Sequence, residues 1–64
     1  MELRRNQPAL QVKADNGDWL YVFCYSNETG GIVPTLNRKN ALNADLDMAW
    51  FQNRFANNEF RAEG

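Results

Sequence analysis

The stretch Asp15-Asn16-Gly17-Asp18 constrains the fold of this chain more than any other feature. Asn-Gly between two alternating runs is the strongest short-range signal for a β-hairpin, because both central residues of a type I′ turn need positive φ angles. The flanking runs, residues 9–14 and 19–25, fit strands. The sequence therefore predicts an antiparallel hairpin closed by a two-residue turn.

A two-residue turn also fixes which residues of the two strands face each other. Asp15 then faces Asp18, and Ala14 faces Trp19. One face is predicted to carry the aromatic side chains, namely Leu10, Val12, Ala14, Trp19, Tyr21, Phe23 and Tyr25. The other face is predicted to carry Ala9, Gln11, Lys13, Leu20, Val22 and Cys24. A slip of one residue would exchange the two faces, so this register is a sharp prediction.

A third strand is expected at Ile32-Val33, after a loop that contains Gly30-Gly31. Pro34 lacks a backbone donor, so this strand should be short and lie at an edge of the sheet. The second strand is apolar on both faces, which is typical of a central strand. The result is a three-stranded antiparallel meander.

A helix is expected next, because Asn43 is a good N-cap residue and Asp45 and Asp47 place negative charge in the first turn. It should run to about Ala56. Two apolar stripes on nearly opposite sides compete for the sheet, one with Leu42, Leu46, Ala49 and Trp50, the other with Met48, Phe51 and Phe55. One sheet covers only one of them well, and the pattern does not select which.

Two segments have more than one interpretation. Residues 36–42 form either a short helical turn or an ordered loop. Residues 59–62 form either a short fourth strand or an extended tail held by Phe60. The predicted fold is a single α+β domain over residues 1–64, with a three-stranded meander followed by one helix packed on the aromatic face of the sheet.

The chain has no histidine, and Cys24 is its only cysteine. A disulfide within the chain is therefore excluded, and both the usual zinc ligands and the commonest general base near neutral pH are missing. Cys24 falls in mid-strand among apolar residues, where burial makes a thiol unreactive. Asp45 and Asp47 point about 200° apart on a helix and cannot converge on one ligand. We therefore expect no enzymatic activity, no cofactor and no metal.

The net charge of −1 is a poor footprint for general DNA binding. No apolar run approaches the roughly 20 residues of a membrane span, so no membrane association is expected. The first residues, 1–6, show no hydrophobic stretch of a secretory signal. A lone thiol without a disulfide favours a reducing compartment, and the predicted location is cytoplasmic.

Protein–protein binding is the predicted function, either as a small adaptor or inhibitor of another protein or by self-association. A single core of this size rarely supplies more than about 3–5 kcal/mol, so a second subunit is a natural source of stability and a homo-oligomer is expected. Apolar residues left over by the core would form the interface. The predicted interface residues are Trp50, Phe51, Phe55, Leu20 and Val22. On this hypothesis Val22→Asp would abolish the interface and leave the fold intact.

Single-stranded nucleic-acid binding is the alternative. Aromatic side chains on a sheet can stack bases, and nearby cations can contact phosphates. The residues that would do so are Trp19, Tyr21, Phe23, Arg38 and Lys39. The preferred interpretation is instead that the aromatic face is the hydrophobic core, because so small a domain needs its largest apolar surface covered.

Overall fold

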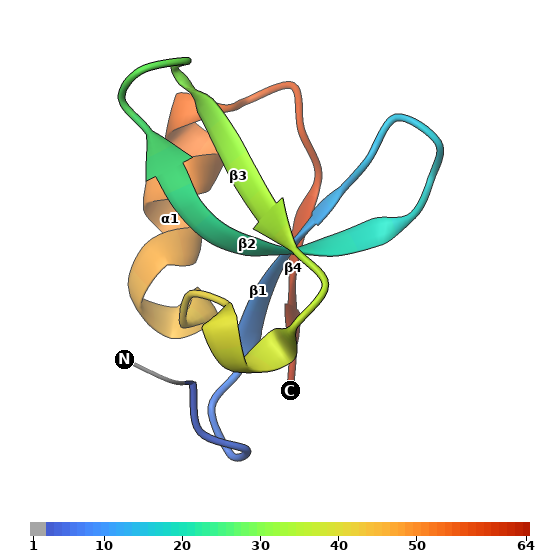
Figure 1. The fold of residues 1–64 in the computed structure, drawn as a ribbon, viewed down its shortest axis with the longest axis vertical. Coiled ribbons are helices and arrows are strands. Elements are labelled where there is room, and N and C mark those ends of the chain that lie inside the picture. Colours follow the sequence, from blue (N-terminus) through green and yellow to red (C-terminus); the bar gives the residue numbers. More distant parts are fainter. Residues whose placement is uncertain (1–2) are drawn as a thin grey trace.

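Four antiparallel strands and one helix make up the computed structural model, which describes residues 3–64 (Figure 1). The sheet has the order β3-β2-β1-β4. The elements are β1 (Ala9–Lys13), β2 (Trp19–Ser26), β3 (Gly31–Thr35), a 3₁₀ turn (Arg38–Asn40), α1 (Ala44–Arg54) and β4 (Phe60–Glu63). The predicted α+β class, the meander and the helix on the sheet are confirmed. Of the two alternatives for residues 59–62, the structure contains the short fourth strand, at Phe60–Glu63.

The hairpin between β1 and β2 closes through three residues, not two. The amide of Ala14 donates to the carbonyl of Asp18 at 2.7 Å, and the amide of Gly17 donates to the carbonyl of Ala14 at 2.9 Å. Among residues 3–64, positive φ angles occur only at glycines, and Gly17 has a φ of 93°. This is the three-residue hairpin loop in which one glycine takes the left-handed conformation. The predicted hairpin is confirmed, and the predicted type I′ turn is wrong.

The extra loop residue shifts the register of the hairpin by one position. Lys13 pairs with Trp19, and Gln11 pairs with Tyr21. Because opposed residues share a face of the sheet, Trp19 and Tyr21 lie with polar partners. The helix covers the opposite face, where Leu10, Val12 and Val22 belong to the buried core. The prediction that the helix packs on the aromatic face is therefore wrong.

A β-bulge in β2 changes the alternation once more. Val22 pairs with Pro34 and Cys24 with Val33, which leaves Phe23 as an extra residue between the two pairs. The extra residue turns Tyr25 back to the side of Val22, where it packs against the core. β2 is central and β3 lies at an edge, as predicted from the sequence.

Leu42 lies between β1 and β2 where these two strands separate. The amide of Leu10 donates to the carbonyl of Leu42, and the amide of Leu42 donates to the carbonyl of Val22, both at 2.9 Å. The next residues continue along β1, because Asn43 forms an isolated antiparallel bridge with Ala9. The chain leading into α1 therefore completes the backbone hydrogen bonding of the sheet.

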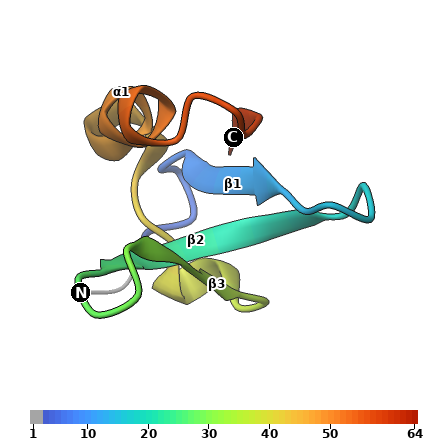
Figure 2. The ribbon, with the colours of Figure 1, turned by 90° about the horizontal axis from the view of Figure 1, so that it is seen from above.

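The two helical segments begin at asparagine caps. The side-chain oxygen of Asn43 accepts from the amide of Asp45 at 2.9 Å, and that of Asn37 accepts from the amide of Lys39 at 3.1 Å. Figure 2 shows α1 on one side of the sheet and the 3₁₀ turn on the other. Of the two alternatives for residues 36–42, the structure contains the short helical turn. No helix within residues 3–64 has the length and apolar character needed to cross a bilayer.

The stripe of α1 that packs on the sheet is the one with Phe51 at its centre. Phe51 is 3% exposed, and Met48 and Phe55 pack against the core beside it. Leu46 and Trp50, from the other stripe, are 78% and 50% exposed. The structure thus settles the choice that the sequence left open.

Candidate binding site

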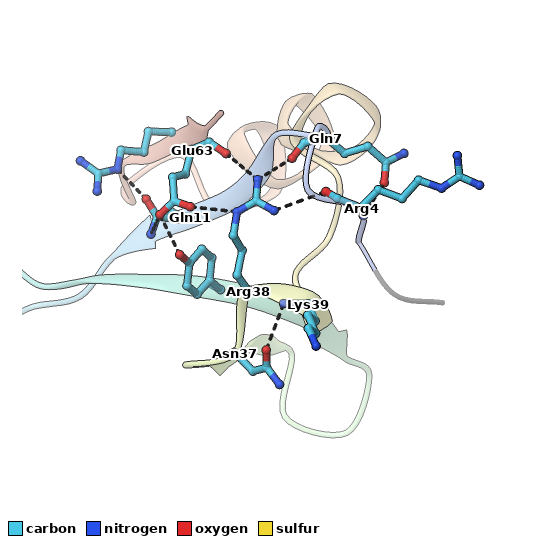
Figure 3. Close-up of polar contacts among 9 residues, drawn as sticks. Arg4, Gln7, Gln11, Asn37, Arg38, Lys39 and Glu63 are labelled. Atoms are coloured by element: carbon cyan, nitrogen blue, oxygen red, sulfur yellow. Dashed lines mark hydrogen bonds and ion pairs between the residues drawn. The ribbon is translucent and has the colours of Figure 1, made fainter.

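Arg38, in the 3₁₀ turn, connects three segments of the chain (Figure 3). Its Nε donates to Glu63 Oε1 at 2.9 Å, and its Nη2 donates to the backbone carbonyls of Gln7 and Glu63. Its Nη1 donates to the carbonyl of Arg4 at 3.4 Å. The guanidinium therefore holds the N-terminal segment, the 3₁₀ turn and β4 together. These donors are already engaged, so Arg38 is poorly placed as the phosphate ligand predicted from the sequence.

Glu63 is the acidic centre of this network. Tyr21 donates its hydroxyl to Glu63 Oε2 at 2.7 Å. That hydrogen bond lowers the pKa of Glu63. The hydrogen bond and charge of Arg38 act in the same direction, and partial burial opposes them. The same hydrogen bond, together with burial and the negative charge of Glu63, raises the pKa of Tyr21. Both shifts favour the pair in which Glu63 is ionised and Tyr21 is protonated.

Gln11 and Arg61 extend the network along the open face of the sheet. Gln11 is buried, and its Oε1 accepts from Arg61 Nε at 2.7 Å. The Arg61 guanidinium also lies 4.1 Å from the centre of the Trp19 ring, a cation–π contact that covers part of this ring. Two of the aromatic residues predicted to stack bases, Trp19 and Tyr21, are thus engaged within the chain.

A basic cleft of about 740 Å³ opens between the N-terminal segment and the 3₁₀ turn. It is lined by Leu3, Arg4, Arg5, Asn6, Asn37, Arg38 and Lys39. Two basic pairs, Arg4-Arg5 and Arg38-Lys39, meet here because the amide of Leu3 donates to the carbonyl of Lys39 at 2.8 Å. Both pairs are visible in the sequence, but nothing in the sequence indicates that they converge.

Three cations of the cleft, Arg4, Arg5 and Lys39, have no side-chain partner among the residues that the structure describes. Their side chains are exposed and make no hydrogen bond or ion pair with residues 3–64. In Figure 3 the Arg4 side chain extends away from the Glu63 network. The charge of Arg38, in contrast, is compensated by Glu63 at 2.9 Å. The cleft can therefore offer three cations to an anionic ligand.

The predicted protein-interface residues are divided by the structure. Val22 is fully buried and Phe51 nearly so, which makes both of them core residues. A side chain without exposed surface cannot contact a partner, and a charge at Val22 would be buried at high cost. In this fold Val22 and Phe51 therefore offer no surface to a partner, and Val22→Asp is expected to destabilise the core. Trp50 is half exposed, and Leu20 and Phe55 are partly buried.

Two exposed leucines, Leu46 and Leu36, are not among the predicted interface residues, although Leu46 shares its predicted stripe with Trp50. Leu46 lies on the outer stripe of α1, and its helical spacing from Trp50 was the available signal. Leu36 is exposed after β3 and lines a shallow groove of about 160 Å³ with Leu20, Pro34 and Thr35. No periodic pattern marks Leu36.

The predicted nucleic-acid residues are brought together only in part. Tyr21 and Arg38 meet at Glu63, and Lys39 lines the basic cleft. Phe23 is 45% exposed at the bulge of β2. The predicted set therefore does not form one continuous stacking surface.

Metal coordination has no obvious site in the part of the chain that the structure describes. Residues 3–64 hold no group of three or more His, Cys, Asp or Glu side chains that could bind a metal ion.

Comparisons with protein-family models, with curated proteins and with solved structures found no match. The function therefore has to be inferred from the exposed surfaces.

Proposed function

We propose that this chain is a small non-catalytic protein-binding module, acting as an adaptor or inhibitor or by self-association. The observation that carries the proposal is the outer stripe of α1, where Leu46 and Trp50 remain 78% and 50% exposed. They are one helical turn apart and therefore neighbours on the surface. Single exposed apolar residues are ordinary, but a paired leucine and tryptophan form a patch suited to a protein partner.

Trp50 has the features of an interface anchor. Its ring makes edge contacts with Tyr25 and Phe51, at centroid distances of 5.3 and 4.9 Å. These contacts hold the ring in place before binding, so less conformational entropy is lost when a partner covers it. Tryptophan and arginine are among the residues most enriched in binding hot spots. The basic cleft supplies the arginines.

The test is an affinity pull-down from lysate of the source cell, run with and without nuclease. Trp50→Ala is the test variant, and Gln52→Ala, also exposed on α1, is the matched control. A hot spot of at least about 2 kcal/mol corresponds to a loss of more than tenfold in partner recovery. We expect that loss for Trp50→Ala alone, with nuclease having no effect. Equal recovery with both variants, at unchanged circular dichroism, would contradict the proposal.

Single-stranded nucleic-acid binding is a second candidate, favoured by one observation. Because α1 packs on the other face, Trp19, Tyr21 and Phe23 stay on the open face, beside Lys13 and Arg61. Base stacking should quench the fluorescence of Trp19 in a Trp50→Phe variant, and this effect should weaken steeply with salt. Unchanged fluorescence on addition of an oligonucleotide would remove this candidate.

A further inference from the structure

We propose that the basic cleft receives the first turn of α1 from a second copy of this chain, so that two copies form a two-fold symmetric pair. This inference rests on the proposed protein-binding function and names its partner. The segment inserted is Asp45-Leu46-Asp47, and the receiving residues are Leu3, Arg4, Arg5 and Lys39.

Charge complementarity is the first argument. Asp45 and Asp47 lie about 100° to either side of Leu46 on the helix, so they point to opposite flanks of this exposed side chain and would meet different cations at the rim of the cleft, not one common ligand. Within residues 3–64 neither of them takes part in an ion pair, since the ion pair of that region joins Arg38 and Glu63. The cleft presents three cations that are equally without partners there. Pairing these opposite charges across an interface steers association and fixes its register.

Shape and apolar character provide the second argument. The cleft, of about 740 Å³, is open to solvent, so it can receive an exposed surface segment of another chain. Leu3 is part of its wall, and the aliphatic stems of Arg4 and Arg5 add apolar surface below their charged ends. Leu46, which is 78% exposed in a single copy, would be covered there. The segment Asp45-Leu46-Asp47 therefore matches the cleft in two ways: Leu46 meets its apolar surface, and the two carboxylates meet its cations.

The positions of the two surfaces favour a two-fold axis. The amide of Leu3 bonds the carbonyl of Lys39, and the amide of Ala44, the first residue of α1, bonds the carbonyl of Pro8 at 2.9 Å. Figure 1 accordingly shows the N-terminal segment, the 3₁₀ turn and the start of α1 at one end of the molecule. When a cleft and the segment that fills it are adjacent, one two-fold rotation forms both contacts at once.

A second copy fits this cleft better than a nucleic acid does. Three free cations would give a salt dependence of only about −2 in log–log slope on a single strand, from about −0.7 for each phosphate. A net charge of −1 leaves little repulsion between copies. In a symmetric pair each contact also occurs twice, so the free energy of two modest contacts contributes to one association.

The experiment is sedimentation equilibrium from micromolar to millimolar concentration, with a charge exchange as its control. The wild-type mass should rise from 7.4 kDa towards twice that value and return to 7.4 kDa in about 1 M salt, where the Debye length is about 3 Å. Arg5→Glu and Asp45→Lys should each stay monomeric, because like charges then meet at both contacts. Mixed in equal amounts the two variants should pair. At one contact the two substituted side chains would meet with opposite charges, and at the other Arg5 would meet Asp45 as in the wild type.

Several outcomes would overturn the inference. One is a wild-type mass of 7.4 kDa at every concentration, and another is a mixture that does not restore association. Masses growing beyond the pair would indicate head-to-tail contact and exclude the two-fold arrangement. Circular dichroism verifies that both exposed variants fold. If the chain is monomeric but the pull-down retains a different protein through Trp50, this inference fails while the proposed function stands.

Discussion

Replacing Phe51 by alanine tests which stripe of α1 forms the core. The Phe51 ring is 3% exposed and lies between Trp50, Phe55 and Phe60, at centroid distances of 4.9, 6.0 and 6.1 Å. Leu46→Ala on the same helix is the matched control, because Leu46 is 78% exposed. Both variants introduce alanine, the best helix former, so their difference reports packing.

The expected magnitudes are far apart. Truncating a buried phenylalanine to alanine costs about 3–5 kcal/mol, through lost transfer free energy and the cavity left behind. A single core in a chain of 64 residues rarely supplies more than about 3–5 kcal/mol of stability. Phe51→Ala should therefore lose half or more of the stability, and Phe51→Leu about 1–2 kcal/mol. Leu46→Ala should change it by less than about 0.5 kcal/mol.

The assay is urea unfolding followed by circular dichroism, at low protein concentration so that association does not contribute. With an m value of about 1 kcal/mol/M for so small a domain, Phe51→Leu should lower the midpoint by about 1–2 M. Phe51→Leu keeps the test measurable if Phe51→Ala does not fold. A Leu46→Ala midpoint as low as that of Phe51→Leu would refute the assignment of the core stripe.

Four further predictions use the same unfolding assay. The pKa of Glu63 is lowered, so its contribution to stability is present above the ordinary carboxyl pKa and is lost as pH falls through the lowered value. On acidification the wild type should therefore lose its stability advantage over Glu63→Gln. The pKa of Tyr21 is raised, so its contribution should be lost only as pH rises through that raised value, a loss that Tyr21→Phe would not show. Gly17→Ala should cost about 1–2 kcal/mol because φ is 93° there. The space around Gly17 is open, so the added methyl group does not clash and the cost reports the backbone angle alone. Gly31 has no positive φ, so Gly31→Ala should be nearly neutral. Asn43→Ala should remove the helix cap and cost about 1 kcal/mol; an unchanged midpoint would count against the cap.

Elements with local signals could be predicted from the sequence. Asn43 followed by two acidic residues marks the start of α1, and the structure places the cap at that residue. Pro34 restricts its strand to an edge, and β3 lies at an edge. Each of these signals acts within a few residues, because capping and the missing proline donor are local properties of the backbone.

The register of the hairpin could not be predicted because the turn sequence is compatible with two loops. Asn16-Gly17 suits a type I′ turn, but a three-residue loop needs a positive φ only at Gly17. Burial decides between them, since the observed loop places Leu10 and Val22 under the helix. The bulge at Phe23 has no signal of its own in the sequence.

The candidate site depends on contacts between distant parts of the chain. Arg38 and Glu63 are 25 residues apart, and Leu3 and Lys39, which also meet, are separated by an even longer stretch of chain. A single sequence shows two basic pairs and a glutamate near the end of the chain, without indicating which of them neutralises which. The basic cleft therefore emerges only from the packing of the N-terminal segment on the 3₁₀ turn.

The position of Leu42 also determines how this sheet can form. β1 and β2 pair directly from Gln11 and Tyr21 to the turn. At the other end, away from the turn, the two strands are joined only through Leu42, which lies 20 residues after Val22 in the chain. The hairpin cannot complete itself locally, so its closure waits for a long-range contact, which slows folding. Opening at Leu42 releases both strands at once. The amide hydrogens of Leu10 and Leu42 should therefore exchange with solvent together, in one cooperative unit.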